Sequence, residues 1–188
     1  MADRSTRRAA VIASLVAVPV ALLVAAISFG YLASRTDKAT PTASPTVAAA
    51  TSPGTLTMPA PKLSPAHAQA CLAFIAQLPT KLRNLPERHV NAPEQNAAFG
   101  DPAVTVQCGA AEAHPAPTDQ IWPISGVCWF AQTGTASTVW TTLDREVPVA
   151  VTIPNHYAAG GAASGQWAAE FSAPLVSAMP SIKTPYNC

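Results

Sequence analysis

Four cysteines are the residues whose type and number point most directly to chemistry: Cys71, Cys108, Cys128 and Cys188. All of them lie beyond a long apolar segment near the start of the chain. An even number in that position is typical of two disulfides formed in an oxidising compartment. The sequence has no C-x-x-C motif and no Cys/His pairs with the spacing of zinc ligands, so we predict no metal site. Four cysteines allow three pairings, and their spacing does not choose among them.

The other residues capable of catalysis do not form a recognisable set. The histidines are scattered without H-x-H or H-x-x-x-H spacing: His67, His89, His114 and His156. Ser125 and Ser164 each precede a glycine, but neither lies in the G-x-S-x-G motif of a nucleophile elbow. A pair of carboxylates that includes Asp101 or Asp119 is the enzymatic alternative, of the kind that glycosidases use. We predict no catalytic residue, no cofactor-binding residue and no cofactor.

Three further residues are candidates for a structural or interaction role. Arg88 and Asp101 flank a polar loop, and a buried ion pair between them would fix that loop against a sheet. Trp140 is less readily assigned to the core than Trp129 and Trp167. A pocket lined by Trp140, Arg88 and a carboxylate would favour an enzyme or small-ligand-binding domain over a protein-interaction domain.

The charge distribution excludes nucleic acid as a partner. The whole chain has a net charge of +1, but from Ala66 onward it carries five Lys and Arg against eight Asp and Glu. Proteins that bind nucleic acid carry clustered cations that neutralise phosphates, and this region has no such cluster. Asp144, Arg145 and Glu146 fall at a predicted hairpin turn, where we expect solvated charges.

A transmembrane helix is predicted over residues 9–34, which contain no charged side chain. A helix of this length spans about 39 Å, more than the ~30 Å hydrocarbon core of a bilayer. The alternative is a cleaved signal peptide, whose apolar region is usually only about 7–15 residues long. Small residues at 48–50 would supply a cleavage site.

The flanking charges favour an orientation with the amino terminus inside, since Arg4, Arg7 and Arg8 precede the span. Residues 1–8 are then cytoplasmic, the lipid bilayer is a partner of the helix, and the rest of the chain lies outside the plasma membrane. Residues 35–64 are rich in Pro, Ala, Ser and Thr, which predicts a disordered linker. Residues 65–188 form the extracytoplasmic domain.

The predicted elements of this domain are a helix, four strands and a second helix. Ser64 is a good N-cap and Pro65 suits the first helical position, so the first helix begins there and ends before Pro79. A helical turn follows at Leu82 and Leu85. The strands are expected at 103–108, 124–132, 137–143 and 147–153, and the last helix at 167–179, bent or split by Pro174.

Short connections between the strands predict an antiparallel meander, covered on one face by the two helices. The fold class is therefore α+β, with a four-stranded sheet. Alternation in the fourth strand predicts that Val147, Val149, Val151 and Ile153 face the helices.

The ordered motifs of the domain resemble the actinobacterial family known as domain of unknown function 3515, which consists of N-anchored secreted proteins. The matching pieces are Leu78-Pro79, Arg88, 99–103 (FGDPA), Cys108-Gly109, 126–129 (GVCW) and 149–154 (VAVTIP). Phe99 stands where the family has Trp. The resemblance implies an envelope setting and no assigned activity.

The same resemblance implies a disulfide pairing, because Cys71 and Cys108 match the pair of cysteines that is common to the family. Cys128 and Cys188 are then an added pair. The rival pairing joins Cys108 to Cys128. From all these observations we expect a non-catalytic domain that binds an unknown envelope protein or acts as an accessory factor of the cell envelope. The alternative is an envelope enzyme or a small-ligand-binding domain.

Overall fold

The computed structural model of the chain describes residues 54–186 and residue 188. The predicted cytoplasmic residues 1–8, the predicted membrane span 9–34 and the linker up to residue 53 lie outside the described residues. Within the described part, no helix is both long and apolar enough to cross a membrane.

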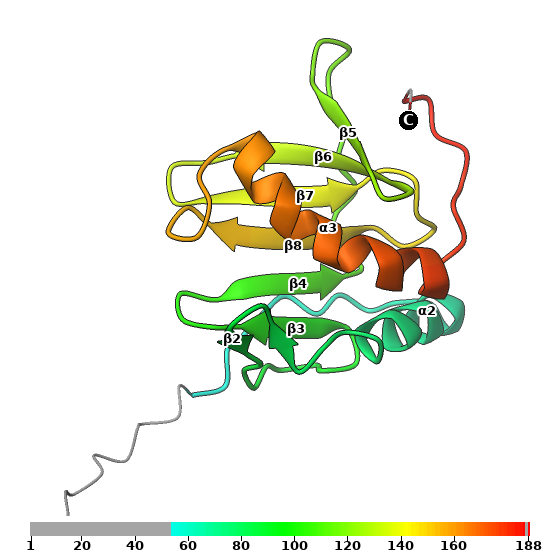
Figure 1. Ribbon diagram of the computed structural model, residues 1–188. Helices are drawn as coiled ribbons and strands as arrows, with labels where there is room; N and C mark the ends of the chain where they lie inside the picture. The colour runs from blue at the N-terminus through cyan, green and yellow to red at the C-terminus, as the bar shows by residue number, and fades with distance from the viewer. Residues whose placement is uncertain (1–53, 187) are drawn as a thin grey trace, which may run out of the picture. The chain divides into compact units, whose positions relative to one another are not determined.

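A six-stranded antiparallel sheet forms the centre of the domain, in the order β3-β4-β8-β7-β6-β5. Its strands are β3 (Asn96–Phe99), β4 (Val104–Cys108), β5 (Ile121–Ile124), β6 (Val127–Thr133), β7 (Ser137–Thr142) and β8 (Val149–Pro154). The helices α2 (Pro65–Ile75) and α3 (Gly161–Ala178) pack on one face of this sheet (Figure 1). A separate two-stranded hairpin is formed by β1 (Lys81–Leu82) and β2 (Leu85–Pro86).

The α+β class and the antiparallel sheet are confirmed, but the prediction of four strands is wrong. β3 was missed because its four residues are all buried, so the sequence shows no alternation of polar and apolar side chains. β5 was missed because it contains Pro123, which argues against a strand except at the edge of a sheet. β5 is such an edge strand. The helical turn expected at Leu82 and Leu85 is instead the β1–β2 hairpin.

The predicted meander is also wrong for β4. The strands from β5 to β8 lie side by side in chain order. β4 pairs with β8, so β4 lies at the opposite end of this group from β5, the strand that follows it in the sequence. The long connection over residues 109–120 carries the chain across the sheet from β4 to β5. Its start is anchored beside β8, because the amides of Gly109 and Ala110 both donate to the carbonyl of Pro148, at 2.9 and 3.0 Å.

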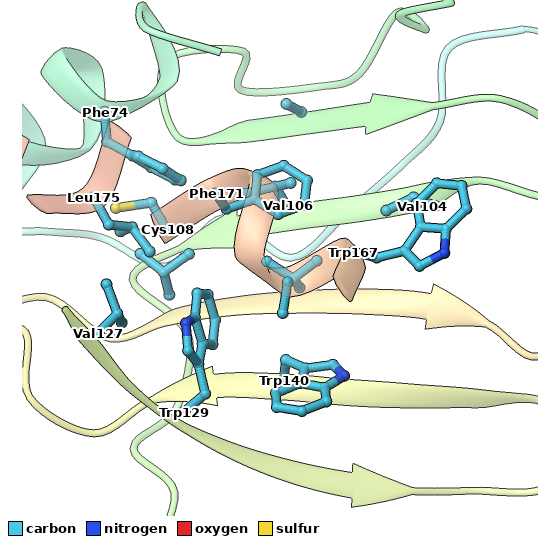
Figure 2. Packing of buried hydrophobic residues seen from close by; sticks show 14 of the residues in the cluster. Phe74, Val104, Val106, Cys108, Val127, Trp129, Trp140, Trp167, Phe171 and Leu175 are labelled. Carbon is cyan, nitrogen blue, oxygen red and sulfur yellow. The ribbon is translucent and has the colours of Figure 1, made fainter. Parts of the chain in front are cut away.

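The helix-facing side of the sheet carries the hydrophobic core (Figure 2). Val106, Val151 and Trp140 are directly opposed on three neighbouring strands, so they form one row on this face. The prediction that alternate residues of the fourth strand point into the core is confirmed, since all four are buried: Val147, Val149, Val151 and Ile153.

Two buried tryptophans attach the sheet to α3. The indole N–H of Trp129 donates to the Ser172 hydroxyl at 3.1 Å, and that of Trp140 donates to the Ser164 hydroxyl at 2.9 Å. A buried indole N–H needs such a partner. A Cβ at Gly165 would lie 3.2 Å from the Trp140 ring, so glycine lets the helix approach the sheet closely.

The first helix begins where the sequence predicts. The Ser64 side chain accepts a hydrogen bond from the amide of His67 at 3.2 Å, and Pro65 occupies the first turn. α3, in contrast, continues through Pro174 as one helix. The expectation of a split there is not met, because packing of the flanking Phe171 and Leu175 in the core holds both halves in place.

The cysteines form the two disulfides that the family resemblance implies. Cys71 of α2 is bonded to Cys108 of β4, with their Cα atoms 5.6 Å apart. Cys128 of β6 is bonded to Cys188, with a Cα separation of 5.8 Å. The first bond joins the first helix to the sheet, and the second joins the C-terminal segment to it.

Asp144 and Arg145 are buried, which corrects the expectation of solvated charges at a turn. The Arg145 guanidinium donates to the carbonyls of Met179, at 3.1 Å, and Gly126, and its Nε lies 3.5 Å from the Asp144 carboxylate. That carboxylate also accepts from the amide of Cys128 at 3.0 Å. The two charges are buried because the C-terminal segment returns over them, which no local pattern reveals.

Candidate functional site

Two adjoining hollows beside β3 form the best candidate site. One has a volume of 350 Å³ and the other 270 Å³, and both are lined by Glu87, Arg88 and His89. We call the two hollows together the Arg88 groove. Its remaining lining residues are Leu85, Pro86, Gly100 and Asp101 in the first hollow and Val90 and Pro93 in the second.

The backbone of the groove is fixed against the edge of the sheet. The Arg88 amide donates to the carbonyl of Ala98 at 2.8 Å, and the Gly100 amide donates to the carbonyl of Pro86 at 2.9 Å. The segment therefore covers the outer edge of β3, which would otherwise present unpaired backbone groups. Because these backbone hydrogen bonds are made within the protein, the extended segment holds the side chains of the groove in place.

Gly100 closes one end of the groove because no other residue fits there. Its φ is +75°, a conformation that other residues seldom adopt. A Cβ would lie 2.9 Å from a methyl carbon of Leu85 and 3.0 Å from the Tyr157 hydroxyl. The turn that presents Asp101 thus depends on glycine at position 100.

The Tyr157 hydroxyl holds the same turn in place from the other side. It donates to the carbonyl of Pro102 at 2.8 Å. Burial, together with the negative charge of Asp101, raises the pKa of Tyr157 above its ordinary value. A phenol is already protonated at neutral pH, and the raised pKa favours the same form, in which the hydroxyl is a donor.

Arg88 and Asp101 form an ion pair, but a partly exposed one. The distance from Arg88 Nη1 to Asp101 Oδ1 is 3.5 Å, and the side chains are 13% and 79% exposed. Nη1 also donates to the carbonyl of Gly100 at 3.3 Å. An ion pair with so exposed a carboxylate contributes little to stability. Asp101 is accessible at the mouth of the groove.

The structure does not bring Trp140 to this site. Trp140 is fully buried beneath α3, and its strand is separated from β3 by β8 and β4 (Figure 2). The pocket of Trp140, Arg88 and a carboxylate that would favour an enzyme is therefore not formed. Asp119, the other candidate member of a carboxylate pair, accepts a local hydrogen bond from the amide of Ala116 at 2.7 Å.

Arg83 was missed by sequence reasoning and positions one wall of the site. It lies in the turn of the β1–β2 hairpin with φ +54°. Its guanidinium sits 4.1 Å from the centre of the Trp167 ring, 3.4 Å from the Glu170 carboxylate and 3.0 Å from the carbonyl of Gln166. These contacts hold the hairpin, and with it Leu85, against α3. The cue available in the sequence was a polar Arg83-Asn84 pair between two leucines.

A third hollow, of 270 Å³, lies between the C-terminal segment and residues 112–114. Its walls carry charges of both signs, including Glu112, Glu146 and Lys183. The buried cation in its wall, Arg145, is already bound by backbone carbonyls. Among the residues that the structure describes, no group of three or more His, Cys, Asp or Glu side chains is placed to hold a metal ion.

Comparison with known proteins gives one match. The family model described as a protein of unknown function, DUF3515, matches residues 16–183. No curated protein and no solved structure matches the chain.

Proposed function

The chain belongs to the DUF3515 family, and from this premise we propose that it is a membrane-anchored accessory factor that binds another protein of the cell envelope. The predicted helix at 9–34 anchors it in the plasma membrane as a single-pass protein. The domain lies outside the cytoplasm and contacts its partner through the Arg88 groove. It performs no catalysis.

The two disulfides support the extracytoplasmic placement. Every cysteine of the chain is paired: Cys71 with Cys108 and Cys128 with Cys188. Structural disulfides persist in oxidising compartments and are rare in the cytosol, where thiols are kept reduced. A single-pass anchor followed by a disulfide-bonded domain is consistent with such a compartment.

The observation that carries the interaction role is the form of the Arg88 groove. It runs along an extended chain segment, has apolar surface from Leu85 and Pro86, and carries charged groups at Glu87, Arg88 and Asp101. Apolar contact with a charged rim is the usual anatomy of a protein-binding surface.

A second candidate function is the binding of a small molecule. The hollow beside Gly100 measures 350 Å³, at the lower end of the roughly 300–1,000 Å³ typical of small-molecule sites. Arg88 would orient an anionic group of such a ligand. This alternative differs from the first in needing no protein partner.

A photo-crosslinking amino acid at position 89, in the groove, tests the proposal in native membranes. We expect one or a few discrete crosslinked proteins from His89, which is exposed at the shared wall of the two hollows. The matched control is Gln132, which is exposed at the far end of β6. Equal crosslinking from both positions, or none from position 89, would contradict the proposal.

A further inference from the structure

We infer that the Arg88 groove binds an extended peptide segment that carries a lysine or arginine, seated with its cation between Asp101 and Glu87. The inference rests on the proposed protein-binding function and names the chemistry of the partner. The charge of the groove, its shape and its apolar surface support the inference.

The charge available to a ligand at the groove is negative. Arg88 is engaged, because its Nη1 contacts both the Gly100 carbonyl and the Asp101 carboxylate. Asp101 remains 79% exposed. Glu87 is exposed and forms no ion pair with any of the described residues. A cation therefore finds two accessible carboxylates, whereas an anion would have to displace Asp101 from Arg88.

The charge of the whole domain acts in the same direction. From Ala66 onward eight acidic residues exceed five basic ones. Lys81 lies opposite Pro86 in the β1–β2 hairpin. It does not line either hollow. A domain of net negative charge raises the association rate of a basic segment, and salt screens this effect.

The shape of the groove suits an extended chain. The two hollows share a wall formed by Glu87, Arg88 and His89, and they measure 350 and 270 Å³. Alternate side chains of an extended peptide are about 7 Å apart and point to the same side. Two such side chains can enter adjoining hollows, which one compact ligand would fill only in part.

The apolar surface of the groove indicates a second residue of the bound peptide. The cation enters the hollow that Asp101 lines, so this second residue enters the other hollow, where Val90 is half-buried and Pro93 is exposed. Apolar burial contributes roughly 25 cal/mol per Å², so a Val or Leu side chain there adds affinity that charge alone does not supply. The bound segment therefore combines an apolar residue with a basic residue two positions away.

The test uses the full chain in nanodiscs and three capped pentapeptides. Each peptide has valine at both ends, two positions from the central residue, and threonine on either side of that residue. Their central residue is lysine, glutamine or glutamate, and binding is followed by fluorescence anisotropy. We expect the lysine peptide to bind about tenfold more tightly than the glutamine peptide at low salt, which corresponds to about 1.4 kcal/mol. The difference should shrink in 500 mM salt.

The double variant Glu87→Gln/Asp101→Asn should remove the preference for lysine. The matched control is Glu112→Gln/Asp119→Asn, which removes two exposed carboxylates outside the groove and should leave it unchanged. Preferred binding of the glutamate peptide would overturn the inference, as would loss of the preference in the control. If no peptide binds while His89 still crosslinks a protein, the inference fails and the proposed function stands. If His89 crosslinks nothing, the proposed function fails as well.

Discussion

Replacing Arg145 by methionine will lower the free energy of unfolding by about 3–5 kcal/mol, the usual effect of removing one partner from a buried ion pair. The Arg145 side chain is 3% exposed. Its loss leaves the Asp144 carboxylate buried without a counter-charge and leaves the carbonyls of Met179 and Gly126 without a donor. Three segments far apart in the sequence lose their common contact.

Urea unfolding with the disulfides intact measures this effect. All four tryptophans lie in the domain, at 122, 129, 140 and 167, so fluorescence reports on it even in the full chain. Lys81→Met is the control, because it removes an exposed cation. The double variant Arg145→Met/Asp144→Asn should recover part of the loss, since the unpaired charge is removed. A change below about 1 kcal/mol in Arg145→Met would mean that the guanidinium is solvated.

Replacing Val149 by aspartate will abolish the cooperative unfolding transition. Val149 is fully buried on the helix-facing side of β8, opposite Cys108. An unpaired carboxylate at such a site costs several kcal/mol, comparable with the total stability of about 5–15 kcal/mol of an ordinary domain. The variant should show the tryptophan emission of an unfolded chain without added denaturant.

Thr152→Asp is the matched control on the same strand. Thr152 points to the opposite face, which the helices do not cover, and is partly exposed. A loss of about 1 kcal/mol is expected there, because aspartate is a poor strand residue. Retention of wild-type melting by Val149→Asp would place β8 with its other face toward the helices and contradict the fold.

Local signals made some elements predictable. The Ser64-Pro65 pair marks the start of α2 because a cap and a first-turn proline act within a few residues. The alternation in β8 marks its buried face for the same reason. Each of these depends only on neighbours in sequence.

β3 was not predictable because its environment is built by distant segments. Residues 86–88 cover its outer edge. The Asn96 side chain donates to the carbonyl of Pro59 at 3.2 Å, so part of the predicted linker packs against the domain. Both contacts bury side chains that would otherwise alternate between core and solvent.

The candidate site was predictable in part. A buried ion pair between Arg88 and Asp101 was expected, and the two side chains do form an ion pair, although a partly exposed one. The sequence could not show that Asp101 would remain exposed, because that depends on the turn shaped by Gly100 and Tyr157. The role of Trp140 was left open between the core and a ligand site, since a tryptophan on a half-buried strand has the same pattern whether it faces a ligand or a helix, and the structure places it in the core.

Folding of the domain outside the cytoplasm is tested most directly by disulfide mapping of the protein isolated from membranes. Thiols are blocked before lysis, and the unreduced protein is digested and analysed by mass spectrometry. We expect the linked pairs Cys71–Cys108 and Cys128–Cys188 and no blocked thiol. A Cys108–Cys128 fragment would contradict the fold, and four blocked thiols would contradict the extracytoplasmic placement.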